Sequence, residues 1–195
     1  MKFIRVIKSS LLNENSLGEP ITNNEQTLQN FWSWFNGSKA IDEKGRPLVV
    51  YHGTTKKFDT FDKSKIGLRD SWYGQGFYFT PNYDTAKHYY TKTPGGNYSK
   101  SGHVKNLYLC IKNPFIVNNW TEIMNEYGQL KKPDYLNNFD YNKYDGIFIY
   151  EQRSNAFGTT KNIYEIIAFE PNQIKSVSNN INYNKEDNSI YGSKL

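Results

Sequence analysis

The sequence has little of what membrane-spanning and secreted proteins require. It contains no run of about 18 apolar residues, so it predicts no helix that crosses a membrane. Residues 1–8 interrupt their apolar positions with charge and lack the continuous apolar stretch of a signal peptide. We therefore expect a cytoplasmic protein with no membrane partner. Cys110 is the single cysteine, which excludes an intrachain disulfide.

Clusters of metal ligands and of basic residues are also missing from the sequence. His52, His88, His103 and Cys110 do not have the spacing of zinc ligands, so we expect no metal. The net charge is +5, yet the basic residues are scattered, with no run of five. A charge of this size is compatible with a dinucleotide, an acidic protein or nucleic acid, and it selects none of these partners.

Aromatic residues are what the sequence has in abundance. Its 16 Tyr, 12 Phe and 4 Trp can bury large areas, and 195 residues fit one domain of ordinary size. Residues 1–24 are mixed and polar and predict an arm or linker. Residues 25–177 predict a single domain, and the Asn-rich residues 178–195 predict a loose polar tail.

Hydrophobic periodicity predicts several strands and few helices. Leu28, Phe31, Trp32 and Phe35 have the i, i+3, i+4, i+7 spacing of an amphipathic helix that ends at Asn36. Further helices are predicted over residues 82–92 and 120–130, and strands over 47–51, 77–79, 104–117, 145–150 and 164–169. Because the strands do not alternate strictly with helices, we expect an α+β fold with split antiparallel sheets.

Three short segments set a polar residue into an apolar, strand-like run. They are residues 49–54, with His52; residues 74–80, with Tyr78; and residues 164–171, with Glu165. Taken alone, His52 could cap a turn at a strand end and Glu165 could point to solvent from an edge strand. A carboxylate in a buried strand is costly unless it is paired or faces a cleft. The alternatives therefore stay open for each residue by itself.

The glycines before Tyr78 do not form a dinucleotide fingerprint. Gly74 and Gly76 lack the third glycine and the helix that follows directly in such a motif, which excludes a Rossmann fold.

In chain order, His52, Tyr78 and Glu165 resemble the active-site triad of the His-Tyr-Glu class of ADP-ribosyltransferases, which includes poly(ADP-ribose) polymerases and diphtheria-type toxins. Residues 31–54 and 169–177 resemble phage-encoded and polyvalent-protein members of that superfamily. The resemblance implies a two-sheet NAD-binding fold. It also implies cleavage of the nicotinamide–ribose bond of NAD and transfer of ADP-ribose to a protein or nucleic-acid acceptor. We expect a monomeric toxin or effector in a bacterial or phage-infected cell.

The resemblance also implies roles for individual residues. His52 would bind a ribose hydroxyl, the Gly53 backbone would pair with the nicotinamide carboxamide, and Tyr78 would stack on the nicotinamide ring together with Tyr89 or Tyr90. The full set of implied NAD-binding residues is His52, Gly53, Thr54, Tyr78, Thr85, Tyr89 and Tyr90.

Glu165 is the implied catalytic carboxylate, with His52 and Tyr78 beside it. It would bind the ribose 2′-OH and stabilise the positive charge that develops as nicotinamide leaves. Arginine-modifying relatives carry Glu or Gln two residues earlier, where this chain has Ile163, so arginine is a disfavoured acceptor. The polar residues 151–163 predict a mobile loop that faces the acceptor through Gln152, Arg153 and Asn155.

Two other functions are compatible with the same fold. One is an NAD glycohydrolase toxin, which transfers ADP-ribose to water. The other is a non-catalytic virion or interaction module. The presence of His52, Tyr78 and Glu165 together argues against the non-catalytic alternative.

Overall fold

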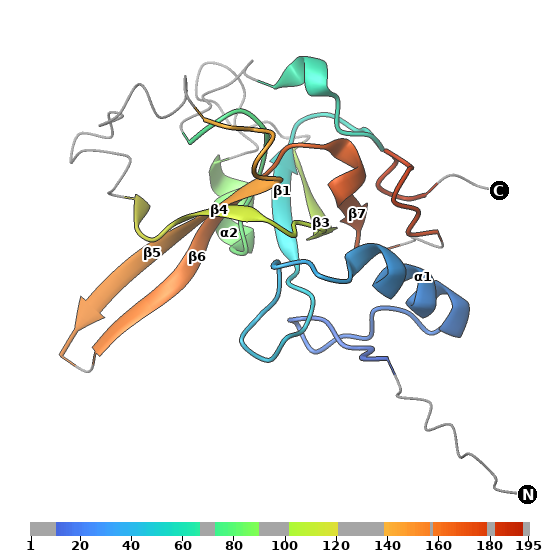
Figure 1. Ribbon diagram of the computed structural model, residues 1–195, viewed down its shortest axis with the longest axis horizontal. Coiled ribbons are helices and arrows are strands. Elements are labelled where there is room, and N and C mark those ends of the chain that lie inside the picture. The colour runs from blue at the N-terminus through green and yellow to red at the C-terminus, as the bar shows by residue number, and fades with distance from the viewer. Residues whose placement is uncertain are drawn as a thin grey trace, which may run out of the picture.

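The computed structural model describes residues 11–66, 73–89, 102–120, 139–156, 158–178 and 182–192. Within these ranges seven strands form two sheets, accompanied by two α-helices and short 3-10 turns (Figure 1). The strand orders are β1-β3-β7 and β2-β6-β5-β4. All neighbouring strands are antiparallel except β4 and β5, which are parallel. The predicted α+β fold with two split sheets is confirmed.

The elements have the following bounds. The first sheet contains β1 (Val50–Thr54), β3 (His103–Leu109) and β7 (Ile174–Ser176). The second contains β2 (Phe77–Phe79), β4 (Pro114–Val117), β5 (Gly146–Asn155) and β6 (Gly158–Ala168). The helices are α1 (Glu25–Phe35) and α2 (Tyr83–Tyr89), and the 3-10 turns are η1 (Lys63–Lys65) and η3 (Pro171–Gln173).

Apolar side chains from the facing surfaces of the two sheets form the main core. Val50, Leu107 and Ile174 come from the first sheet, and Phe79 and Ile166 come from the second; none of the five is exposed. Their alternation along each strand directs one set of side chains into this layer. The core therefore fixes how the two sheets lie on each other.

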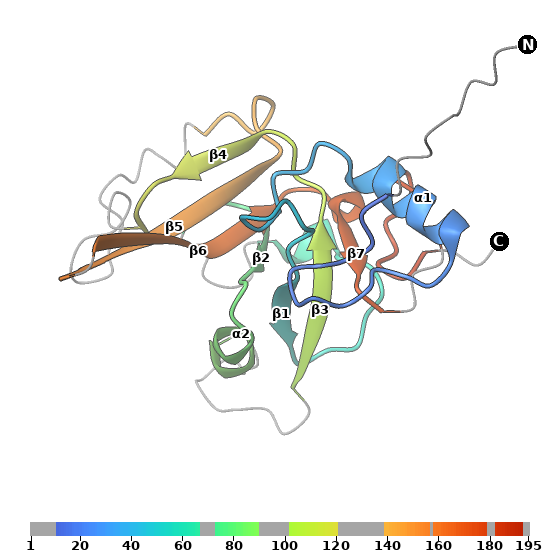
Figure 2. The ribbon, with the colours of Figure 1, turned by 90° about the horizontal axis from the view of Figure 1, so that it is seen from below.

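Helix α1 covers the outer face of the first sheet (Figure 2). It begins where the Asn24 side chain accepts a 2.9 Å hydrogen bond from the backbone N–H of Thr27, as an N-cap does. The Phe31 ring centroid lies 5.1 Å from those of Phe35 and Tyr108. The helix predicted from the aromatic spacing is confirmed.

The two sheets meet at one backbone bridge. Tyr51 of β1 and Thr80, which follows β2, exchange hydrogen bonds of 2.8 and 3.1 Å. Beyond this bridge β1 and β2 pair with different partners, so the sheets separate at this point. His52 and Gly53 continue β1 past the bridge, whereas the sequence predicted a strand that ended before them.

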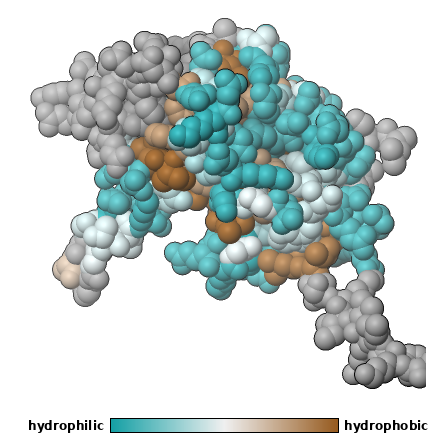
Figure 3. All heavy atoms as spheres, viewed as in Figure 1, coloured by the Kyte–Doolittle hydropathy of each residue, from teal (hydrophilic) through white to brown (hydrophobic). Residues whose placement is uncertain are grey.

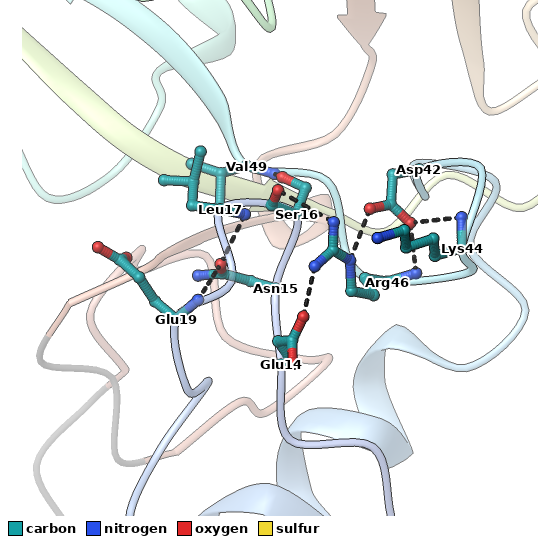
Figure 4. A network of polar contacts seen from close by, with 9 residues as sticks. All are labelled: Glu14, Asn15, Ser16, Leu17, Glu19, Asp42, Lys44, Arg46 and Val49. Atoms are coloured by element: carbon teal, nitrogen blue, oxygen red, sulfur yellow. Dashed lines mark hydrogen bonds and ion pairs between the residues drawn. The ribbon is translucent and has the colours of Figure 1, made fainter.

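The described part of the N-terminal arm is docked onto the fold. Asn15 is fully buried; its side-chain oxygen accepts two backbone hydrogen bonds within the arm, and its amide donates to the Tyr108 hydroxyl at 3.1 Å. The Arg46 guanidinium pairs with the carboxylates of Asp42 and Glu14 (Figure 4). A polar segment thus becomes ordered by satisfying buried polar groups.

The described part of the C-terminal segment is also packed, in contrast to the loose tail expected from its composition. Tyr183 and Ile190 are buried, and the Lys175 ammonium, itself fully buried, donates to the carbonyls of Asp187 (2.5 Å) and Ser189 (2.8 Å). Two buried side chains and the hydrogen bonds of one buried ammonium therefore fix this segment, although its polar composition predicted a loose tail.

Strands β5 and β6 form a long hairpin that projects from the body of the protein (Figure 1). Their pairing continues to Asn155 and Gly158. The prediction of a loop over residues 151–163 was therefore wrong, because most of these residues belong to the two strands. Most described side chains there are exposed (Figure 3), so no hydrophobic alternation marked the strands in the sequence. Residues 121–130 of one predicted helix, and residues 90–92 of another, lie outside the described residues.

Candidate active site

The three polar residues of the sequence pattern lie in the middle or near the end of three strands. His52 is in β1, Tyr78 in β2 and Glu165 in β6. Strand β2 pairs with β6 and approaches β1 at the Tyr51 bridge, so it lies between the other two. The fold thus brings three distant segments to the junction of the two sheets.

A hydrogen bond joins the first two of these residues. The His52 Nδ1 lies 2.9 Å from the backbone oxygen of Tyr78. Because a carbonyl can only accept, Nδ1 carries a proton in this hydrogen bond. The imidazole packs against Phe61, with ring centroids 5.0 Å apart, and against Phe79 at 5.7 Å. The ring is therefore held in one orientation by packing as well as by the hydrogen bond.

Tyr78 and Glu165 share one face of the second sheet. Tyr78 lies opposite Ile167, and Glu165 is two residues from Ile167 on the same strand, so both side chains point to the outer face. Diagonal neighbours in an antiparallel pair are about 7–8 Å apart. The His52 side chain instead faces the core between the sheets. Tyr78 connects the two sides, since its carbonyl binds His52 and its ring lies on the face of Glu165.

The Tyr78 hydroxyl is tied into the preceding loop. It donates to the Gly74 carbonyl at 2.6 Å and accepts from the Tyr73 backbone N–H at 3.1 Å. Burial raises the pKa of Tyr78, and the negative charge of Glu165 raises it further. The same two causes raise the pKa of Tyr73. Both phenols stay neutral and lie within the electrostatic reach of Glu165.

A β-bulge precedes Glu165. Ile149 pairs with Glu165 whereas Tyr150 pairs with Ile163, so Tyr164 is the extra residue on β6. The Tyr164 carbonyl accepts a 3.1 Å hydrogen bond from the Thr80 hydroxyl, and this bond links the bulge to β2. Bulges redirect neighbouring side chains. Glu165 is only 4% exposed, so its carboxylate is withdrawn from bulk water.

The bulge also separates Ile163 from Glu165. Ile163 packs with Tyr150 against the core between the sheets, whereas Ile149, the partner of Glu165, belongs to the cluster on the outer face. Residues i and i+2 of a regular strand would share a face. The residue two positions before Glu165 therefore points away from the carboxylate.

Gly53 places its backbone at an open edge of β1. Alternate residues of a strand present their N–H and C=O groups to the same edge. Tyr51 directs both groups to Thr80, so Gly53, two residues further on, directs its groups to the same side beyond the end of the bridge. Within the described residues no strand pairs there. One donor and one acceptor thus lie at the point where the sheets separate.

Gly76 allows the loop before β2 to lie directly on β6. Its φ is +155°, and a Cβ there would lie 2.4 Å from Cγ2 of Ile167 and 2.7 Å from the backbone oxygen of Ala168. No other residue type fits this contact without displacing backbone. The loop that holds the Tyr78 hydroxyl is therefore pressed against the strand that carries Glu165.

The remaining predicted NAD-binding residues are only partly described. The Thr54 hydroxyl accepts from the Lys56 backbone N–H at 3.1 Å, which forms a turn after β1. The Thr85 backbone N–H donates to the Asn82 side chain at 2.8 Å, at the start of α2. Tyr89 ends α2, and its side chain lies outside the described residues, as does all of Tyr90.

The predicted acceptor-facing residues lie on the projecting hairpin. Gln152 and Arg153 are exposed on β5, and Arg153 pairs with Glu151 at 3.0 Å. The side chain of Asn155 lies outside the described residues. The three positions therefore lie on one strand, β5.

Sequence reasoning missed Tyr73 and the bulge at Tyr164. Tyr73 is 7% exposed and touches the Tyr78 hydroxyl through its backbone. In the sequence, only its position directly before Gly74 could have indicated that Tyr73 lies near the site. No residue pattern marked the bulge, because an extra residue appears only when the two strands are aligned.

No group of three or more His, Cys, Asp or Glu side chains among the described residues is arranged to hold a metal ion. No helix in the described part of the chain is both long and apolar enough to cross a bilayer.

Comparison with known proteins identifies the family. No curated protein matches the chain. The family described as ADP-ribosyltransferase in polyvalent proteins matches residues 42–183, a range that contains β1 to β7 and all three of His52, Tyr78 and Glu165. The chain therefore belongs to this family of ADP-ribosyltransferases.

Proposed function

We propose that the protein cleaves the nicotinamide–ribose bond of NAD and transfers the ADP-ribose to a macromolecular acceptor, a protein or a nucleic acid. One observation carries the proposal: a buried carboxylate, Glu165, lies with Tyr78 at the junction where the open backbone edge of Gly53 begins. The family match supports an ADP-ribosyltransferase, and the ADP-ribose donor that we propose is NAD.

The open edge of β1 suits the carboxamide of nicotinamide. The amide presents one donor and one acceptor in a plane, and so does the backbone of Gly53. The absence of a side chain lets a flat ring approach closely. Tyr78, with Tyr89 or Tyr90, supplies aromatic surface for stacking, and His52 supplies Nε2 to a ribose hydroxyl. Thr54 and Thr85 complete the proposed set.

Glu165 supplies the charge that the reaction needs. The bond between ribose C1′ and the nicotinamide nitrogen breaks, its electron pair stays on that nitrogen, and positive charge develops on the ribose. A fixed carboxylate in a water-poor site stabilises that charge and binds the 2′-OH. An acceptor oxygen or nitrogen then bonds to C1′ and gives its proton to Glu165 or to solvent.

Arginine is an unsuitable acceptor for this site. A guanidinium would need a hydrogen-bond acceptor next to the catalytic carboxylate, and Ile163 offers none. The bulge adds a second reason, since it turns the side chain at position 163 toward the core between the sheets. The exposed hairpin, with Gln152, Arg153 and Asn155, is the element that we propose to face the acceptor.

Incubation with labelled NAD and a cell lysate tests this function. Label that moves to protein or to nucleic acid identifies the acceptor class. Nuclease treatment before separation releases label that is bound to nucleic acid, and hydroxylamine releases ADP-ribose that is bound to protein through an ester. Release of nicotinamide with label in neither fraction would identify water as the acceptor. No release of nicotinamide under any condition would refute the proposal.

A further inference from the structure

A cavity of about 740 Å³ lies beyond the end of β7, at the edge of the first sheet that is farther from β2. Its walls come from three segments distant in sequence and from the N-terminal half of β3. They include Lys57, Phe58, His103, Lys105, Ser178 and Tyr191. We call this cavity the β7-end pocket. Its volume is within the range of small-molecule sites, about 300–1,000 Å³.

The pocket exists because β7 is shorter than β3. Strand β7 pairs only with Leu107–Leu109, and one further hydrogen bond, from the Val177 N–H to the Asn106 carbonyl (3.0 Å), extends the pairing. Since Asn106 points its backbone to that edge, Val104, two residues earlier, does so as well. The N–H and C=O of Val104 thus border the pocket, which Val104 lines.

Positive charge and aromatic surface meet in this pocket. Lys57 and Lys105 supply the positive charge, and Asp59 is the one acidic residue among the lining residues. The Lys105 ammonium lies 4.6 Å from the Phe58 ring centroid and 5.5 Å from that of Tyr191. It donates one hydrogen bond, to the Phe58 carbonyl at 2.8 Å, and an ammonium has three donors.

The walls of the pocket are held in place by the packed C-terminal segment. The Ile190 N–H donates to the Asp59 carbonyl at 2.7 Å, and its own carbonyl accepts from the Ser176 N–H at 2.7 Å. Ile190 is fully buried, so it fixes the adjacent Tyr191 at the pocket rim. A site with fixed walls loses little conformational entropy on binding.

The pocket is separate from the Gly53 edge. Gly53 and Val104 are paired across β1 and β3, so their backbone groups point to opposite edges of this two-stranded ribbon. Phe58 stands between the pocket and His52, with its ring 6.2 Å from the imidazole and its carbonyl bound by Lys105. A ligand at the Gly53 edge therefore does not fill the pocket unless Phe58 moves.

We propose that the β7-end pocket binds a nucleotide, independently of NAD at the Gly53 edge. The phosphate would bind Lys57 and His103, the base would lie against Tyr191, and the polar edge of the base would pair with the Val104 backbone. A nucleotide combines these three features: negative charge, a flat ring and an edge with both donors and acceptors. The site would hold a nucleic acid strand, or a free nucleotide, at the edge of the first sheet opposite the catalytic junction.

Calorimetric titration with AMP, and with a short single-stranded DNA, tests the site in the protein without NAD. Lys57→Glu should weaken AMP binding about tenfold or more, since a charge-assisted hydrogen bond becomes a repulsion. Lys65→Glu makes the same charge change on exposed η1, outside the pocket, and should alter AMP affinity less than twofold. Tyr191→Ala should weaken it about fivefold. Melting curves establish that each variant is folded.

A second titration uses Glu165→Gln protein saturated with NAD, because this variant should bind NAD without consuming it. Our expectation is that AMP still binds, and that Lys57→Glu leaves NAD affinity unchanged. Equal losses of AMP affinity in Lys57→Glu and Lys65→Glu would overturn the proposal. So would absence of AMP binding at millimolar concentration. Binding of AMP but not of DNA would restrict the ligand to a free nucleotide. Failure of NAD to bind would refute the proposed function, yet the first titration would still decide the nucleotide site.

Discussion

At the scale of single residues, the ring and the hydroxyl of Tyr78 have different surroundings, and we propose a separate role for each. Its ring lies on the face of Glu165, and its hydroxyl joins the backbone of Tyr73 and Gly74. Removing the hydroxyl should affect the loop, whereas removing the ring should affect the ligand. Substitutions at Tyr78 can therefore distinguish an effect on the loop from an effect on NAD binding.

We predict that Tyr78→Phe lowers the free energy of unfolding by about 1–2 kcal/mol, because the buried Tyr73 N–H loses its acceptor. NAD affinity should change less than threefold. Tyr78→Ala should weaken NAD binding roughly tenfold, because one aromatic face of the nicotinamide site is lost. Chemical denaturation and calorimetry measure the two quantities. Equal NAD affinity in Tyr78→Phe and Tyr78→Ala would show that the ring makes no contact with the ligand.

The sequence was enough to single out these residues, but it did not predict their orientations or contacts. His52, Tyr78 and Glu165 were visible because each is polar in an apolar run. The orientation of His52 toward the core between the sheets was not predictable, since it depends on which strand lies beside β1. Tyr73 became notable only through its contact with the Tyr78 hydroxyl.

At the scale of elements, Gly76 holds the loop before β2 against β6. Gly76→Ala should cost about 3 kcal/mol or more, because φ is +155° and the new Cβ would overlap the Ala168 carbonyl. Gly45→Ala is a matched control: its φ is +77° and no atom lies within 4 Å, so only backbone strain of about 1 kcal/mol is expected. Denaturant titration measures both. Similar losses in the two variants would mean that the contact with β6 is unimportant.

The projecting hairpin offers a test of acceptor recognition. Glu151 pairs with Asn162 and has the same parity as Asn155–Gly158, the pair that closes the present two-residue loop, so residues 152–161 can be replaced by Asn-Gly without changing the register. We expect transfer to the acceptor to fall at least tenfold, while nicotinamide release in the absence of acceptor stays within twofold. Gln152→Ala and Arg153→Ala should show the same separation to a smaller degree. Unchanged transfer by the shortened protein would exclude the hairpin from acceptor binding.

Periodicity predicted the elements with strong apolar patterns and missed those held by other means. The α1 helix and strand β2 followed directly from their spacing. The polar half of the hairpin depends on backbone pairing with a neighbour, which leaves no hydrophobic alternation in the sequence. The bulge before Glu165 is likewise a property of two strands together.

At the scale of the whole molecule, buried tyrosines should make the fold sensitive to alkaline pH. Burial raises the pKa of Tyr73, Tyr78 and Tyr183, and raises that of Tyr108 to about 12. Below pH 10 the phenols are protonated in both states, so their stabilising effect is complete. Above pH 10 the unfolded phenols ionise first, and stability falls by about 1.4 kcal/mol per buried tyrosine for each pH unit.

The measurement is the melting temperature between pH 8 and pH 11, together with the ultraviolet absorbance of the phenolate. We expect a plateau to about pH 10 and then a steep decrease, with part of the phenolate signal delayed until unfolding. Titration of all 16 tyrosines near pH 10 in a protein that remains folded would contradict the described burial.

The arrangement of the predicted strands indicated the fold class, whereas composition did not reveal how the C-terminal segment packs. The α+β architecture followed from strands in runs, whereas the packing of the C-terminal segment depends on Ile190 and on Lys175, which binds two of its carbonyls. The average polarity of a segment does not reveal the two or three buried residues that fix it. The same segment forms one wall of the β7-end pocket, which no motif indicated.

The most direct test of the central claim is nicotinamide release by Glu165→Gln, measured beside wild type and the exposed control Glu43→Gln. Glutamine keeps the shape of the side chain and removes the charge that would stabilise the developing cation. We predict that the release rate falls about a hundredfold or more while NAD affinity, measured by calorimetry, changes little. Glu43→Gln should match wild type in both. Release of nicotinamide by Glu165→Gln at the wild-type rate would contradict the proposed role of Glu165.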